Sequence, residues 1–173
     1  MQYLLIDWGN TVMRDLPGVY GPMHTWPRVE ALPGVREALL ALRPSFGLAL
    51  ATNAAESSES EIRLALERVE LSALFDRVFC AGELGERKPD AAFFRAILGA
   101  LGLPPASAFM VGDDFEIDVL GANAVGMRAV WLNSHTRTSQ RGALHATIHD
   151  WSELRAALVS LGAVLVPTRP ALG

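Results

Sequence analysis

The chain has 173 residues, half of them hydrophobic, and this is enough for one domain to bury a core without disulfides. Its formal net charge of −4 argues against nucleic acid or an anionic membrane as the primary partner, since both favour a basic surface. Cys80 is the single cysteine, which excludes an intrachain disulfide, and there is no apolar run of membrane-spanning length and no signal-peptide pattern. We therefore expect a cytoplasmic protein.

Short apolar segments alternate with amphipathic segments along the chain. The sequence predicts strands at Tyr3–Ile6, Gly47–Ala51, Arg77–Cys80, Ala108–Val111, Arg128–Trp131 and Ala146–Ile148. It predicts helices at Val35–Leu42, Ser58–Val69, Ala91–Leu101, Phe115–Ala124 and Ser152–Leu161. This alternation is typical of an α/β fold with three layers, in which a doubly wound, mostly parallel, Rossmann-like sheet is covered by helices on both faces.

Three segments organise the chain. We expect residues 1–163 to form a single domain, within which residues 12–32 are a short loop that is rich in proline and glycine. This loop is too short and irregular to be a helical subdomain. Residues 164–173, which include Pro167 and Pro170, are predicted to be a loose C-terminal tail.

Polar side chains follow the ends of several predicted strands or precede a predicted helix. They are Asp7 after the first strand, Thr52 and Asn53 after the second, Lys88 ahead of the helix at residue 91, and Asp113, Asp114 and Asp118 after the fourth strand. In a doubly wound sheet the carboxyl ends of the strands meet at one crevice. We therefore expect these residues to converge on one site.

This set of residues suits phosphoryl transfer. Carboxylates that lie close together repel one another unless a cation neutralises them, and oxygen ligands favour Mg²⁺. Asp7 is then the candidate nucleophile, forming an aspartyl-phosphate that water hydrolyses, while Lys88 and the Thr52 hydroxyl bind phosphate oxygens. Each residue alone has an ordinary interpretation as a turn residue or helix cap. Their order and their common placement favour catalysis.

The sequence resembles the haloacid dehalogenase superfamily of hydrolases, and within it the phosphoglycolate-phosphatase-like branch. The resemblance is carried, in order, by Asp7–Thr11, Leu48–Asn53, Arg87–Asp90 and Val111–Asp118. It implies a phosphorylated substrate and a Mg²⁺ cofactor. The implied site residues are Asp7 as nucleophile and metal ligand, the Gly9 carbonyl and Asp113 as metal ligands, Asp118 as a carboxylate that supports the metal site, and Thr52, Asn53 and Lys88 as phosphate-binding residues. Asp114 is expected to cap the following helix.

The chain departs from this family at two points. Phosphatases of the family carry a second aspartate two residues after the nucleophile, as general acid and base, and here that position is Gly9. General acid–base catalysis contributes ~10²–10⁴-fold, so a poor leaving group would depart slowly. Asp15 and His24 on the loop are candidate replacements, although a histidine on a loop is more often simply solvated.

The second departure is the absence of the helical cap that usually covers small substrates in this branch. An open crevice favours a bulky phosphorylated substrate, or a partner that completes the site. Two hypotheses follow: a Mg²⁺-dependent phosphohydrolase that is weak on poor leaving groups, and an inactive module of the same fold that binds a phosphorylated ligand or a protein. Retention of Asp7, Thr52, Lys88 and Asp113 favours the enzyme, while the natural substrate and the oligomeric state stay open.

Overall fold

Six short strands pair side by side into one parallel sheet in the order β3-β2-β1-β4-β5-β6. The computed structural model describes residues 1–166. Its strands are β1 (Gln2–Ile6), β2 (Phe46–Thr52), β3 (Arg77–Cys80), β4 (Ala108–Gly112), β5 (Arg128–Leu132) and β6 (His145–Ile148). Every predicted strand is present, with its ends shifted by at most one residue. The predicted doubly wound α/β fold is confirmed.

The helices are α1 (Val35–Leu42), α2 (Glu59–Glu67), α3 (Ala81–Leu84), α4 (Ala91–Leu101), α5 (Gly121–Ala124) and α6 (Leu154–Ser160). The predicted bounds of α1 and α4 are confirmed, and α2 and α6 are shorter than predicted. The helix predicted over Phe115–Ala124 is present with these bounds, and its first part, Phe115–Leu120, is π-helical and leads directly into α5. Helix α3 was not predicted, because a single turn is too short to show a helical period.

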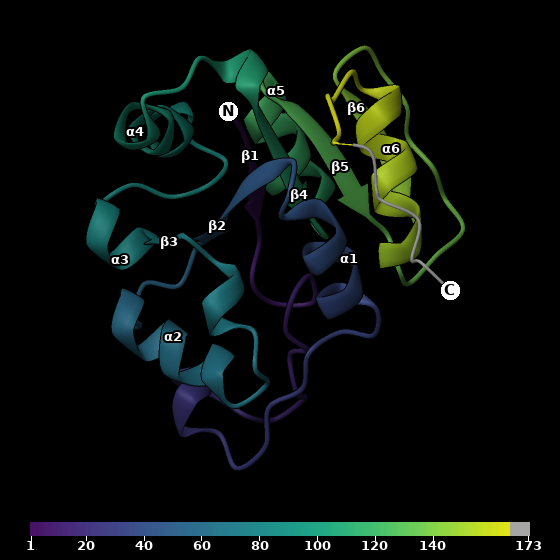
Figure 1. Ribbon diagram of the computed structural model, residues 1–173. Helices are drawn as coiled ribbons and strands as arrows, with labels where there is room; N and C mark the ends of the chain where they lie inside the picture. The colour runs from purple at the N-terminus through teal and green to yellow at the C-terminus, as the bar shows by residue number, and fades with distance from the viewer. Residues whose placement is uncertain (167–173) are drawn as a thin grey trace.

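Side chains alternate across the sheet, so each strand contributes to two cores. Leu4 and Ile6 of β1 belong to a cluster that includes buried residues of α1, α2 and α6. Leu5, between them, belongs to a second cluster with buried residues of α4 and α5. The sheet therefore lies between two layers of helices (Figure 1).

The winding of the chain creates a switch point beside β1. From β1 the chain runs outward to β2 and β3, then returns to the other side of β1 as β4 and continues outward to β6. Strands β1 and β4 are in register, with Ile6 opposite Val111, and the Asp7 N–H donates to the Val111 carbonyl at 2.9 Å. The residues that follow β1 and β4 are thus brought together at the carboxyl edge, where open α/β sheets bind ligands.

The segment 12–32 is a loop that is packed against the body of the protein. Its two ends pair with each other through an antiparallel bridge between Met13 and Ala31. Between these ends a short 3₁₀ turn, Met23–Thr25, packs against α2, below it in Figure 1, and Met23 and Trp26 are buried. The loop carries no larger helix.

The first residues of the predicted C-terminal tail are hydrogen-bonded to residues at the amino ends of β1 and β2. The Val164 N–H donates to the Gln2 side chain at 2.9 Å, and the Val166 N–H donates to the Ser45 hydroxyl at 2.9 Å. The rest of the predicted tail, 167–173, lies outside the described residues.

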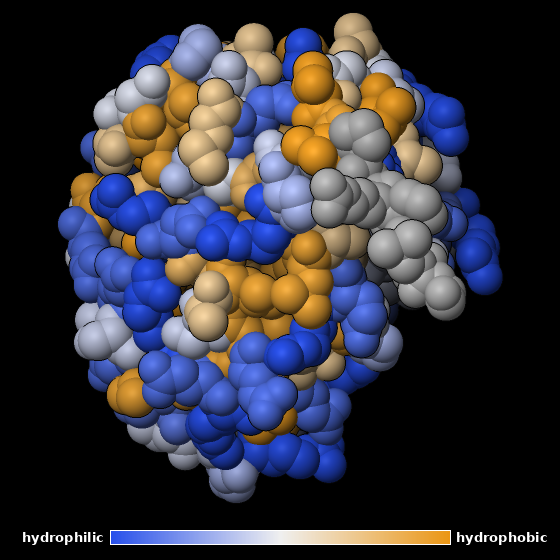
Figure 2. Space-filling view, in the orientation of Figure 1, coloured by the Kyte–Doolittle hydropathy of each residue, from blue (hydrophilic) through white to orange (hydrophobic). Residues whose placement is uncertain are grey.

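One face of the molecule shows apolar side chains in its centre, bordered by polar ones (Figure 2). Several large apolar side chains on the helices are exposed, among them Leu40 on α1, Leu64 on α2 and Val159 on α6. In the described part of the chain no helix has the length and apolarity needed to span a bilayer.

Candidate active site

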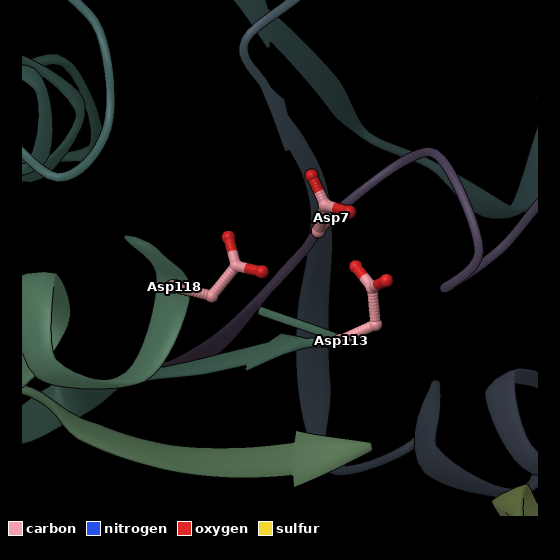
Figure 3. A group of neighbouring side chains, drawn as sticks. All are labelled: Asp7, Asp113 and Asp118. Atoms are coloured by element: carbon pink, nitrogen blue, oxygen red, sulfur yellow. The ribbon is translucent and has the colours of Figure 1, made fainter. Parts of the chain in front are cut away.

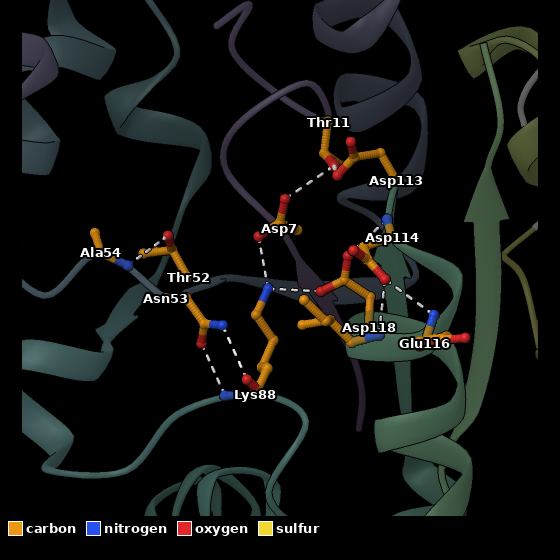
Figure 4. Close-up of polar contacts among 11 residues, drawn as sticks. Asp7, Thr11, Thr52, Asn53, Ala54, Lys88, Asp113, Asp114, Glu116 and Asp118 are labelled. Carbon is orange, nitrogen blue, oxygen red and sulfur yellow. Dashed lines mark hydrogen bonds and ion pairs between the residues drawn. The ribbon is translucent and has the colours of Figure 1, made fainter. Parts of the chain in front are cut away.

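A buried lysine joins two carboxylates at the carboxyl edge of the sheet. The Nζ atom of Lys88 lies 2.6 Å from Oδ1 of Asp7 and 2.6 Å from Oδ1 of Asp118 (Figure 4). The side chains of Lys88 and Asp118 are each only 2% exposed. A buried charge is tolerated only when it is paired and hydrogen-bonded, as it is here, so the lysine and the two carboxylates stabilise one another.

The loop that carries Lys88 is held by Asn53, which follows β2. The Asn53 side-chain amide donates to the Lys88 carbonyl at 2.9 Å and its oxygen accepts from the Lys88 N–H at 2.8 Å. Asn53 was predicted to bind substrate. In the structure both ends of its amide contact the Lys88 backbone, so Asn53 holds the loop that carries the lysine, and its binding of substrate stays a prediction.

Asp118 is placed by the turn that follows β4. Asp114 accepts hydrogen bonds from the N–H groups of Glu116 (3.0 Å) and Ile117 (2.9 Å), so the prediction that Asp114 caps the following helix is confirmed. The Asp114 N–H in turn donates to Oδ2 of Asp118 at 3.1 Å. A Cβ on Gly112 would overlap the Asp118 carboxylate, which explains the glycine at this position.

Three carboxylates face one another beside this lysine. One oxygen from each of Asp7, Asp113 and Asp118 lies within 4.8 Å of the others (Figure 3). The Thr11 hydroxyl stands between two of them, 3.1 Å from Asp7 Oδ2 and 3.3 Å from Asp113 Oδ1. It has one hydrogen to donate, so it serves one carboxylate at a time. Sequence reasoning had not singled out Thr11, whose only signal was its place at the end of the first motif.

The electrostatics of the cluster indicate an excess of negative charge. Burial and the neighbouring Asp7 raise the pKa of Asp113 to about 6. Burial, followed by the charge of Asp7, also raises the pKa of Asp118. Burial opposes the charge on Lys88, but the carboxylates of Asp7 and Asp118 outweigh it and raise the pKa of the lysine. One buried cation therefore faces three acids.

This donor set fits a divalent cation. Its ligand atoms are oxygens, which hard cations such as Mg²⁺ prefer, and a cation would offset the charge that Lys88 leaves uncompensated. Within residues 1–166, Lys88 is the one lysine or arginine that forms ion pairs with these acids. The acidic cluster can therefore hold a metal ion.

The remaining predicted residues lie around the same edge. Thr52, at the end of β2, is buried, and its hydroxyl oxygen accepts from the Ala54 N–H at 3.1 Å, which leaves the hydroxyl hydrogen available to donate. Gly9 lies in the tight turn after Asp7, in which Asn10 takes a positive φ of 50° and its N–H donates to the Met13 carbonyl. Asparagine is one of the few residues that adopt this conformation readily.

The two loop residues named as candidate acids have different positions. His24 lies against α2, with Nε2 4.0 Å from Glu61 Oε1, and so faces a structural partner. Asp15 lies beside the turn at Gly9 and Asn10. It is solvent-accessible, yet partial burial of its carboxyl group, together with the charge of Asp7, raises its pKa.

Fold and site together define a doubly wound α/β domain with an acidic centre, paired with one buried lysine, at the switch point of its sheet. The sequence profile of the haloacid dehalogenase-like hydrolases matches residues 9–126, more than half of the chain. The chain therefore belongs to this family of hydrolases, as the resemblance of its motifs had implied.

Individual relatives agree with this assignment. The chain is 42% identical to a phosphoserine phosphatase of Thermus thermophilus over 103 residues, which cover 58% of this chain and 40% of the relative. It is 36% identical to a pyrimidine 5′-nucleotidase of Escherichia coli over 112 residues, covering 64% and 48%. The chain thus spans less than half the length of these two relatives.

A solved structure matches over nearly the whole domain. An uncharacterised protein from Listeria monocytogenes superposes with a TM-score of 0.83 at 26% identity, covering 95% of this chain and all of that one. The fold of this chain and that of the Listeria protein therefore match over almost their full lengths.

Proposed function

We propose that this protein is a Mg²⁺-dependent phosphohydrolase in which Asp7 is the nucleophile. The observation that carries the proposal is the buried pair of Lys88 with Asp7 at the switch point, beside an acidic cluster with which no second lysine or arginine of residues 1–166 forms an ion pair. The phosphatase and nucleotidase names of the two curated relatives support phosphate esters as substrates.

The metal would be held by Asp7, the Gly9 carbonyl and Asp113, with Asp118 behind them. When bound, Mg²⁺ supplies positive charge that attracts the phosphate group and offsets negative charge during its transfer. Asp118 already uses Oδ1 for Lys88 and Oδ2 for the Asp114 N–H, so its part is to hold the lysine beside the nucleophile.

The protein's own residues prepare the attack. Lys88 Nζ donates to Oδ1 of Asp7 at 2.6 Å, and the free hydrogen of the Thr52 hydroxyl is available to a phosphate oxygen. An Asp7 oxygen forms a bond to phosphorus while the bond from phosphorus to the leaving oxygen breaks. Water then attacks phosphorus, the bond to Asp7 breaks, and inorganic phosphate is released with Asp7 again a carboxylate.

The preferred substrates follow from the residues around Asp7. Gly9 itself offers no side chain to protonate the leaving oxygen, so acyl and aryl phosphates, whose leaving groups depart without a proton, should react faster than alkyl phosphates, which depend on a donor elsewhere. The packed loop 12–32 carries no helical cap, which favours a bulky phosphorylated substrate.

The test is hydrolysis of p-nitrophenyl phosphate with and without Mg²⁺, comparing the wild type with Asp7→Asn. Turnover should require Mg²⁺ and should fall by at least about 10³-fold in Asp7→Asn, because the nucleophile is lost. Asp90→Asn is the matched control, since Asp90 is exposed and its side chain makes no capping hydrogen bond.

The alternative, an inactive ligand-binding module, predicts a different result. In that case the wild type would show no turnover above Asp7→Asn, while calorimetry would still detect binding of Mg²⁺ and of a phosphate mimic. Equal, Mg²⁺-independent turnover in both proteins would contradict the proposed role of Asp7.

A further inference from the structure

The space where a side chain at position 9 would begin is filled by Asp15. A Cβ placed on Gly9 would lie 2.6 Å from Oδ2 and 2.9 Å from Oδ1 of Asp15. No real Cβ approaches an oxygen so closely, so a side chain at residue 9 and the present position of the Asp15 carboxylate exclude each other. The glycine therefore makes room for this carboxylate.

The position of Asp15 is held by a pair of hydrogen bonds with Asn10. The Asn10 side-chain amide donates to Oδ2 of Asp15 at 3.1 Å, and the Asp15 N–H donates to the Asn10 side-chain oxygen at 3.2 Å. Asn10 is itself fixed in the turn that follows Asp7, because its N–H donates to the Met13 carbonyl. The Asp15 carboxylate is thus tied to the same turn as the nucleophile.

Asp15 also lines a pocket of about 410 Å³ between the loop 12–32 and the segment that follows β2. The wall of this pocket includes Trp8, next to Asp7 in the chain, and Ala54, whose N–H is bonded to the Thr52 hydroxyl. Its outer side is formed by the loop, through residues that include Met23 and Trp26. The pocket is therefore placed to receive the organic part of a phosphate ester whose phosphate lies on Asp7 and Thr52.

From this arrangement we infer that Asp15 is a catalytic residue, the proton donor and acceptor that takes the place of a side chain at position 9. The inference rests on the proposed phosphohydrolase function. In the first step Asp15 gives its proton to the leaving oxygen as the bond from phosphorus to that oxygen breaks, and Asp15 becomes a carboxylate. In the second step this carboxylate takes a proton from the water that attacks the phosphorus on Asp7, which restores the protonated acid.

The first experiment compares wild type and Asp15→Asn on two Mg²⁺-supplemented substrates, p-nitrophenyl phosphate and an alkyl phosphate such as glycerol 3-phosphate. Asparagine keeps the size of the side chain and can keep the bonds to Asn10, but it transfers no proton. For the alkyl phosphate kcat/KM should fall by about 10²–10⁴-fold. For p-nitrophenyl phosphate the first step should change little, so a burst of p-nitrophenol should precede slow turnover as the phosphorylated enzyme accumulates.

Two single variants serve as comparisons. Glu30→Gln removes a carboxylate from the same loop, where Glu30 pairs with Arg14 and Arg28 outside the pocket. This variant should leave the ratio of the kcat/KM values for the two substrates unchanged. Glu56→Gln removes the other acid that lines the pocket. If the loss on the alkyl phosphate appears in Glu56→Gln and not in Asp15→Asn, the assignment to Asp15 is wrong.

A double variant moves the acid from residue 15 to residue 9. Gly9→Asp alone should not raise turnover on the alkyl phosphate, because the new side chain meets the Asp15 carboxylate. On the alkyl phosphate, the double variant Gly9→Asp/Asp15→Ala should be at least about tenfold more active than Asp15→Ala alone. The inference would be overturned if the double variant recovered no activity and Asp15→Asn left the ratio of kcat/KM for the two substrates unchanged.

The outcomes separate this inference from the proposed function. If wild-type turnover does not depend on Asp7, the phosphohydrolase proposal fails and the role of Asp15 falls with it. If turnover depends on Asp7 but Asp15→Asn lowers kcat/KM for both substrates by the same factor and shows no burst of p-nitrophenol, the proposed function stands and Asp15 is only a structural residue. Thermal unfolding of each variant shows whether the fold is kept.

Discussion

The sheet edge and the loop 12–32 are held together in different ways. At the edge, side chains hold side chains: Lys88 lies between Asp7 and Asp118 with both distances at 2.6 Å. Much of the loop is held from outside, since the Arg68 side chain of the C-terminal end of α2 donates to the carbonyl groups of His24, Trp26 and Pro27. The charged side chains at the edge are therefore held by one another, whereas the loop is attached through its backbone.

This difference has a consequence for how each region tolerates change. A backbone carbonyl is present whatever the residue, so the loop can change its side chains and keep its attachment to Arg68. The edge has no such freedom, because each buried charge depends on a named partner. Asp15 connects the two regions, as it belongs to the loop but is bonded to Asn10 in the turn after Asp7.

The largest expected effect comes from removing the cation at the edge. Lys88→Met leaves Asp7 and Asp118 facing each other without a positive charge, so we expect a loss of about 3–5 kcal/mol in the free energy of unfolding. Turnover should also disappear. Urea denaturation measures the first effect, and Arg87→Met, at the exposed neighbouring position, is the control. A loss under about 1 kcal/mol would show that the edge is not held by these pairs.

A second effect concerns metal binding and pH. Because the pKa of Asp113 is raised to about 6, this proposed metal ligand is protonated at lower pH, and Mg²⁺ affinity should fall about tenfold per pH unit below that value. Calorimetry at several pH values measures the change. Asp113→Asn should weaken binding and flatten the profile, while Asp114→Asn should leave the profile intact, since asparagine caps helices as well as aspartate.

The same pKa shift predicts how the metal-free protein responds to pH. Asp113 keeps its proton in the folded state up to about pH 6 but loses it near 3.8 when unfolded. The folded state therefore binds more protons between these values, and its stability should decrease as pH rises from about 4 to 6. Thermal unfolding in EDTA measures how much the Asp113 carboxyl group contributes to stability. The difference in stability between wild type and Asp113→Asn should shrink as the pH is lowered towards 4. A difference that does not vary with pH would contradict it.

The smallest effect is expected at the attachment of the loop. Arg68→Ala removes the donor of three hydrogen bonds to loop carbonyls, and should cost about 1–3 kcal/mol in the free energy of unfolding. The edge is untouched, so kcat for p-nitrophenyl phosphate should stay near the wild-type value while KM rises several-fold. Arg95→Ala on α4, at an exposed position, is the matched control. A large fall in kcat would show that the loop and the edge are coupled.

Local patterns were enough to predict most of the fold. The six strands were recognisable because each is a short apolar run between turns, and α1 and α4 because their apolar residues recur at the helical period. The apolar pattern missed α3, which is a single turn, and it did not indicate that Phe115–Leu120, the first part of a predicted helix, is wound as a π-helix. In that segment Asp114 caps the first turn and Asp118 accepts a hydrogen bond from Lys88.

The site was predictable to the extent that it follows from strand ends. Residues after neighbouring parallel strands must meet at one edge, so Asp7, Lys88, Asp113 and Asp118 could be grouped from the sequence alone. The sequence by itself thus determined the fold class, the family and the charged members of the site. What each neutral residue does was decided only by the tertiary structure: Asn53 holds the Lys88 backbone and Thr11 stands between two carboxylates.

The position of Asp15 shows most clearly what could not be predicted from the sequence. In the sequence Gly9 is a missing acid and Asp15 is one more charge on a loop. Only the folded turn, with Asn10 at positive φ, brings the Asp15 carboxylate into the space that Gly9 leaves open. Such a replacement depends on how two segments lie against each other, and no local period or spacing records that, because the chain distance between residues does not determine where their side chains meet.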